Sequence, residues 1–123
     1  MKQEEITKIV NKVYPLICVD YNSMALVDFH YNIYERLDGI PAIDEYESFA
    51  EYHWDTNKIY LYTDNLNSEE DIIRSLIHEC VHSTQSKVKF DAYYLCGETY
   101  DTHPYEIEAR NAEEMWYKYK IEK

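Results

Sequence analysis

The spacing of apolar residues in the first third of the chain predicts a helix followed by a strand. A helix is expected over residues 3–14, ended by Pro15, and the residues on its apolar face are Ile6, Ile9, Val10 and Val13. Apolar and polar residues alternate over residues 25–34, which favours a strand, although some of the same apolar positions also fit a helix. Residues 38–41, Asp-Gly-Ile-Pro, are typical of a turn or loop.

A β-hairpin is predicted in the middle of the chain. Residues 49–54 and 58–63 are two extended runs, and the residues between them, Asp55-Thr56-Asn57, have the side chains of a turn. In the second run, Ile59 and Leu61 face one side of the strand, and the tyrosines between and after them face the other.

The second half of the chain predicts two helices joined by a loop. Ser68 and the acidic residues after it form a capping-box-like start, so a helix is expected over residues 69–86. Its buried stripe comprises Ile72, Ile73, Leu76, Ile77, Cys80 and Val81. A loop of about 15 residues follows, and the last helix opens at Pro104, with Asp101, Thr102 or His103 as its cap. That helix is expected to run to its terminal lysines, Lys118, Lys120 and Lys123.

Length and charge narrow the classes of protein. The chain has 123 residues, which fits one domain over residues 1–123. Its 24 acidic and 12 basic residues give a net charge of −12, whereas a nucleic-acid binder neutralises phosphates with lysine and arginine. No apolar run approaches the roughly 18 residues of a membrane span, and the first residues do not resemble a signal peptide. A cytoplasmic protein that binds neither nucleic acid nor membrane is therefore expected, as a monomer or small homo-oligomer.

One motif carries chemistry. His78-Glu79-Cys80-Val81-His82 has the form H-E-x-x-H, in the middle of the predicted helix over residues 69–86. Residues four apart lie on one face of a helix, so both imidazoles can bind one Zn²⁺. Glu79 is adjacent to the first histidine and can act as general base toward a water on the metal.

A catalytic zinc usually has three protein ligands, and the third is expected at the start of the last helix. A strand, then H-E-x-x-H, then a Glu-x-x-Ala helix about 24 residues further on resembles the gluzincin metallopeptidases, in particular the minimal, single-domain ones. The similarity covers residues 45–117, whereas the first 40 residues carry no assignable motif. The resemblance implies that Glu106 is the third ligand, next to Ala109 on the helix face. Glu108, about 200° round the helix from Glu106, is the alternative.

The resemblance also implies the fold and the remaining site residues. The fold would be α+β and zincin-like, with a small antiparallel or mixed sheet and its β-hairpin packed on the H-E-x-x-H helix and a C-terminal glutamate helix. Tyr100 or His103 would donate a hydrogen bond to the tetrahedral oxyanion. The strand over residues 58–63 resembles the edge strand on which this family lays an extended substrate.

The chain departs from the family pattern at one position. Family members commonly have Asp or Asn four residues after the ligand, where it holds a ligand imidazole, and this chain has Arg110 there. An arginine cannot accept the ring N–H, so that role falls to another group, such as Glu113 or a backbone carbonyl.

Two functions follow as expectations. The first is a zinc-dependent metallopeptidase, with Zn²⁺ on His78, His82 and Glu106, and a protein or peptide substrate for which the acidic surface would favour basic segments. The alternative is a catalytically weak or inactive zincin-fold binding or inhibitor protein that acts through its acidic surface. Residues 83–85, Ser-Thr-Gln, are similar to those that follow the motif in some antirestriction-type zincin domains, which belong to this alternative class.

Overall fold

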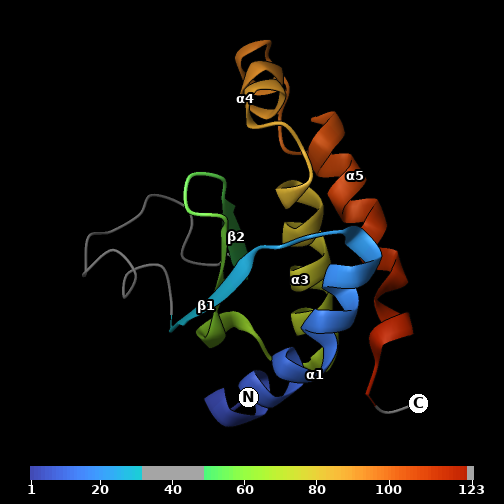
Figure 1. Cartoon of the computed structure of the whole chain (residues 1–123). Coiled ribbons are helices and arrows are strands. Elements are labelled where there is room, and N and C mark those ends of the chain that lie inside the picture. The colour runs from blue at the N-terminus through green and yellow to red at the C-terminus, as the bar shows by residue number, and fades with distance from the viewer. Residues whose placement is uncertain (32–48, 122–123) are drawn as a thin grey trace.

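The computed structural model describes residues 1–31 and 49–121, and within them the chain is α+β (Figure 1). The elements, in chain order, are α1 (Gln3–Tyr21), β1 (Leu26–His30), β2 (Ala50–His53), β3 (Lys58–Tyr62), the short 3₁₀ helix η1 (Thr63–Asn65), α3 (Glu69–Ser83), α4 (Lys87–Leu95), α5 (Pro104–Ala112) and the 3₁₀ helix η2 (Glu113–Tyr119). In the part of the chain that the structure describes, no helix is both long enough and apolar enough to cross a bilayer.

Helix α1 is longer than the sequence pattern predicts, because it does not end at Pro15. The helix continues to Tyr21 and closes at Asn22, whose backbone is left-handed, with φ 53°. Pro15 is exposed and costs the helix one hydrogen bond. Two residues later, Ile17 is completely buried in the core. Burial of such a side chain contributes about 1.5–3 kcal/mol, which offsets the cost of the proline.

The three strands form one mixed sheet in the order β1-β3-β2. Strands β2 and β3 pair antiparallel, which confirms the predicted hairpin, and β1 confirms the strand predicted within residues 25–34. β1 pairs with β3 in parallel, with Val27 opposite Ile59. The prediction that residues 58–63 form an edge strand is therefore wrong, since β3 has a partner on both sides and cannot add a substrate strand. The turn predicted at residues 38–41 lies outside the described residues.

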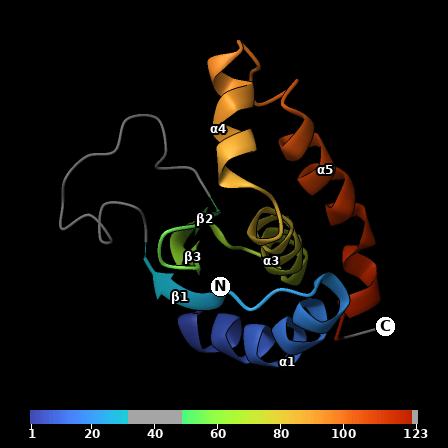
Figure 2. The ribbon, with the colours of Figure 1, turned by 45° about the horizontal axis from the view of Figure 1, so that its top comes forward.

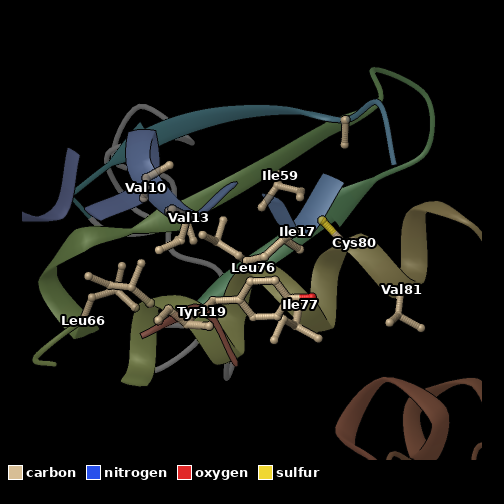
Figure 3. Close-up of a cluster of buried hydrophobic side chains, with 14 of the residues drawn as sticks. Val10, Val13, Ile17, Ile59, Leu66, Leu76, Ile77, Cys80, Val81 and Tyr119 are labelled. Atoms are coloured by element: carbon tan, nitrogen blue, oxygen red, sulfur yellow. The ribbon is translucent and has the colours of Figure 1, made fainter. Parts of the chain in front are cut away.

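Helix α3 is at the centre of the fold. Ser68 caps it as predicted, its Oγ accepting the Asp71 N–H at 3.1 Å, and the helix ends at Ser83, three residues before the predicted end. Figure 2 looks nearly along α3 and shows the sheet, α1 and α5 arranged around it. The shared core is drawn in Figure 3 and includes Val13 and Ile17 of α1, Ile59 of β3, Leu76 and Cys80 of α3, and Tyr119 of η2.

The segment after α3 also differs from its prediction, because part of the expected loop is helix α4. Ser86 caps it by accepting the Lys89 N–H at 3.3 Å, and Gly97 follows it with φ 99°. No residue of α4 is buried, so its sequence carries no stripe by which to recognise it. The last helix begins at Pro104 as predicted, and of the three candidate caps it is His103 that caps it. The helix changes from α to 3₁₀ geometry at Glu113 rather than continuing to the terminal lysines.

The two exposed helical prolines give a test of the α1 assignment. Pro15→Ala restores a hydrogen bond inside α1, so we expect the free energy of unfolding in urea to rise by about 2 kcal/mol. Pro104→Ala is the matched control, because Pro104 is in the first turn of α5, where no intrahelical bond is lost, and its effect should stay below about 1 kcal/mol. A helix that ended at Pro15 would gain nothing from the first substitution.

Candidate metal-binding site

Helices α3 and α5 bring His78, His82 and Glu106 together. The two Nε2 atoms are 3.1 Å apart, and Oε1 of Glu106 lies 2.8 Å from Nε2 of His82 and 3.3 Å from Nε2 of His78. One ligand atom from each residue lies within 4.8 Å of the other two, a spacing that suits a bound metal ion. Ala109, completely buried, is one turn after Glu106 on α5. Of the two glutamates considered for the third ligand, the structure places Glu106 at this point.

Each histidine is held on its other ring nitrogen. Nδ1 of His78 is 2.7 Å from Oε2 of Glu113, and Nδ1 of His82 is 2.7 Å from Oε1 of Gln85. Carboxylate and amide oxygens only accept, so both rings carry a proton on Nδ1. Nε2 of each ring therefore faces Oε1 of Glu106, where it can either carry a second proton or give its lone pair to a metal ion.

The side chain of Gln85 is itself oriented by its amide group. Its Nε2 donates to the backbone oxygen of Tyr105 at 3.1 Å and to Oε1 of Glu108 at 2.6 Å, which leaves Oε1 to face His82. Glu108 thus supports the site from outside the ligand set. The orientation of the His82 ring is therefore fixed by Gln85, just after α3, and through Gln85 by helix α5.

The structure shows which residue fills the role that the family pattern gives to position 110, and what Arg110 does instead. Glu113, three residues further along, supports His78, which was one of the two possibilities open from the sequence. The Arg110 guanidinium instead donates to the backbone oxygens of Tyr100 and Asp101, at 2.7 and 3.2 Å, and lies 4.5 Å from the centre of the Tyr100 ring. It therefore anchors the segment before α5.

The three converging atoms need a positive charge between them. Oε1 of Glu106 is buried and has no hydrogen-bond partner, and it faces two imidazole nitrogens. Burial opposes a charged His78, but the carboxylates of Glu106 and Glu113 that face its ring outweigh burial and raise the pKa of His78 to about 10. Burial likewise opposes ionisation of Glu106, yet the two imidazoles that face its carboxylate hold the pKa of Glu106 well below its usual range. Two imidazoles and one carboxylate are a donor set that suits a divalent transition metal.

Glu79 lies in the same pocket and has the properties of a proton acceptor. Its side chain is buried beside the ligands. Burial raises the pKa of Glu79, while the neighbouring His78 and His82 act in the opposite direction. A carboxylate with a raised pKa takes up a proton more readily than an ordinary one and can still return it.

The site opens into a pocket of about 700 Å³. Strand β2 and the residues flanking it form one wall. The rest is formed by helices α3, α4 and α5, together with Tyr100 before α5 and Glu113 at the start of η2. The wall is rich in aromatic side chains, namely Phe49, Tyr52, Trp54, Phe90, Tyr94 and Tyr100. Trp54 and Phe90 each have their rings within 6.0 Å of the His82 ring, so aromatic surface borders the ligands directly.

The two predicted oxyanion donors are placed differently. Tyr100 lines the pocket and is about half exposed. His103 is completely buried and does not line it. Its Nδ1 accepts the Tyr105 N–H at 3.1 Å, and its Nε2 donates to the backbone oxygen of Phe90 at 2.9 Å. Nδ1 of His103 thus caps α5 and Nε2 attaches α4 to it, so both ring nitrogens are engaged and the structure does not bring His103 to the site.

Tyr94 is a site residue that the sequence reasoning missed. Its hydroxyl donates to Oε2 of Glu106 at 3.0 Å. Burial, together with the adjacent Glu106 carboxylate, raises the pKa of Tyr94 to about 12, so the hydroxyl keeps its proton. With 14 tyrosines in the chain and the segment taken for a loop, no feature distinguished this one. The four-residue spacing of Phe90 and Tyr94 was the available signal.

The outer hydrogen bond to His78 gives a test of the site. Glu113→Ala leaves the ring without its acceptor, so we expect Zn²⁺ affinity, measured by competition with a chromophoric chelator, to fall about 10- to 100-fold. Glu114→Ala removes the adjacent, largely exposed carboxylate and should leave the affinity within about twofold. Equal affinities in the two variants would contradict the role given to Glu113.

A scan of family models and searches of curated proteins and of solved structures found nothing similar to this chain. No relative therefore supplies a function by likeness. The interpretation of the site depends on its own residues and on the distances between them.

Proposed function

We propose that this chain is a zinc-dependent metallopeptidase of the minimal gluzincin type, on a zincin-like fold. The observation that carries the proposal is the convergence of His78, His82 and Glu106 at the inner end of a pocket that also contains Glu79. An H-E-x-x-H helix met by a glutamate from a second helix is the arrangement that this chemistry requires.

Zinc would be held by the two Nε2 atoms and by Oε1 of Glu106. Three protein ligands of this kind are typical of catalytic sites, where a position is left for water or substrate. When bound, zinc supplies a Lewis acid that acidifies water and polarises a carbonyl group. Glu113 and Gln85 would hold the imidazoles in the tautomer that binds metal.

Proton transfer would be the task of Glu79. Its carboxylate would take a proton from the attacking water as the oxygen bonds to the scissile carbonyl carbon. It would return that proton to the amide nitrogen as the C–N bond breaks, releasing a carboxylate and an amine. The raised pKa of the buried Glu79 suits both transfers.

Tyr100 is the proposed donor to the oxyanion that forms on the carbonyl oxygen. It lines the pocket, and the contacts of Arg110 with its ring and backbone oxygen fix its segment. A preorganised hydroxyl of this kind stabilises charge that develops only in the transition state. His103, with both ring nitrogens engaged in packing, has no part in the proposal.

The substrate would be an extended protein or peptide segment. The pocket lies between β2 and the helices, so the substrate would run along this cleft and not beside β3. The charge of −12 and the pocket carboxylates outside the ligand set, such as Glu51 and Asp71, favour a basic segment.

Metal analysis tests the ligand set. Elemental mass spectrometry of tag-free protein should find one zinc per chain in the wild type, and the zinc should be lost in His82→Ala and Glu106→Ala. Glu108→Ala tests the alternative third ligand. Glu108 contacts Gln85 and not the ligand atoms, and Gln85 would keep its bond to the backbone oxygen of Tyr105, so this variant should keep its zinc. Absence of metal from the wild type, even after zinc is added back, would refute the metal-dependent function.

Substitution of the proposed base tests the chemistry. Glu79→Gln should lower the hydrolysis of a mixed peptide library at least about 100-fold, since general-base catalysis contributes 10²–10⁴, while one zinc per chain is retained. Glu114→Gln is the matched control at a largely exposed carboxylate that contacts Arg74, and it should keep both zinc and activity. A Glu79→Gln variant that cleaves as fast as the wild type would remove Glu79 from the mechanism.

A further inference from the structure

The two carboxylate oxygens of Glu106 have different surroundings. Oε1 faces the Nε2 atoms of His78 and His82 and has no hydrogen-bond partner. Oε2 points the other way and accepts the hydroxyl of Tyr94 at 3.0 Å. Oε1 is therefore available to a cation, whereas Oε2 is already engaged by a neutral donor.

This difference bears on how Glu106 would bind a metal. A carboxylate can ligate through one oxygen or through both, and the second mode uses one more coordination position. We propose that Tyr94 is a positioning residue that holds Oε2 and presents only Oε1 to the metal, so that a position remains for water or substrate. This inference rests on the metal site of the proposed function. It adds that Tyr94 limits the number of ligand atoms that the protein gives to the metal.

Tyr94 can serve in this way only if α4 is held against the site, and His103 provides that attachment. The rings of Phe90, Tyr93 and Tyr94 lie 4.5, 5.2 and 4.5 Å from the ring of His103, centre to centre. The hydrogen bond from His103 to the backbone oxygen of Phe90 joins α4 to the first turn of α5. Figures 1 and 2 both show α4 beside this end of α5, beyond the end of α3.

Residues 94–106 therefore contain the proposed metal ligand Glu106, the helix cap His103 and the hydrogen-bond donor Tyr94. Glu106 is three residues after His103, and His103 contacts the ring of the tyrosine that hydrogen-bonds to Glu106. A shift of α4 would move the Tyr94 hydroxyl away from Oε2. The ligation mode of Glu106 is thereby coupled to the packing of α4.

Cobalt substitution tests this directly, with Co²⁺ alone as the probe. Tyr94→Phe removes only the hydroxyl, so the ring and the packing of α4 are retained. We expect the Co²⁺ dissociation constant to rise about 10-fold. We also expect the visible d–d absorption to weaken, because four-coordinate Co²⁺ absorbs more strongly than Co²⁺ with an added ligand oxygen. Tyr93→Phe is the matched control, since its ring also packs on His103 without contacting Glu106, and it should keep the wild-type spectrum and affinity.

The outcomes separate this inference from the proposed function. Far-UV circular dichroism and Tm establish that each variant is folded. A loss of packing around His103 would affect both variants, so a change in the cobalt spectrum of Tyr94→Phe alone reports the loss of its hydroxyl. A Tyr94→Phe protein with the spectrum and affinity of the wild type would overturn the inference, as would a wild type that binds no Co²⁺. A wild type that binds Co²⁺ but cleaves no peptide would overturn the peptidase proposal, and the role of Tyr94 would then be decided by the spectrum alone.

Discussion

The contact between α3 and α5 is electrostatic at its centre, and the site depends on it. Helix α5 has two buried residues, Glu106 and Ala109, and one of the two is an acid. A buried carboxylate is costly unless it is paired, and its partners here are the two histidines of α3. The attachment of α5 to the rest of the molecule is therefore strongest when a cation, either a proton or a metal ion, lies among these three side chains.

Helix α3 supplies the rigid side of this contact. Ten of its 15 residues are buried, because the sheet, α1 and the α5–η2 segment all pack on it. Apolar residues such as Leu76 and Cys80 fill the core on one face, while His78 and His82 point to the pocket on another. Because both histidines belong to a helix that is buried over two thirds of its length, their side chains have little freedom to move.

Features encoded by local patterns could be predicted from the sequence. The capped helix around H-E-x-x-H, the hairpin, a cap just before Pro104 and the position of Glu106, rather than Glu108, beside the histidines all depend on short spacings. The length of α1 could not be predicted, because burial of Ile17 outweighs Pro15 only in the folded structure. The central position of β3 depends on parallel pairing with a strand some 30 residues earlier.

The parts of the site that the sequence left open or missed have a related cause. Glu113 could only be named beside a backbone carbonyl as a support for an imidazole, because it reaches His78 across 35 residues of sequence, from the start of a 3₁₀ segment whose position no local pattern specifies. Tyr94 lies on a helix without a buried face, held by ring contacts to His103. Interactions made by a single polar atom or a ring edge leave no periodic trace in the sequence.

The exposure of α4 has a consequence for how such a protein can change over time. Since no residue of α4 enters the core, insertions, deletions or replacements between Ser86 and Thr102 need not disturb α1, α3 or the sheet. Contacts of single side chains tie this segment to the candidate metal ligands: the Phe90 ring lies against His82, the Tyr94 hydroxyl bonds to Glu106, and rings of α4 pack on His103. The segment is thus a wall of the pocket that can be replaced. By changing it, descendants of one chain could come to bind different molecules, while the helices that carry His78, His82 and Glu106 are inherited unchanged.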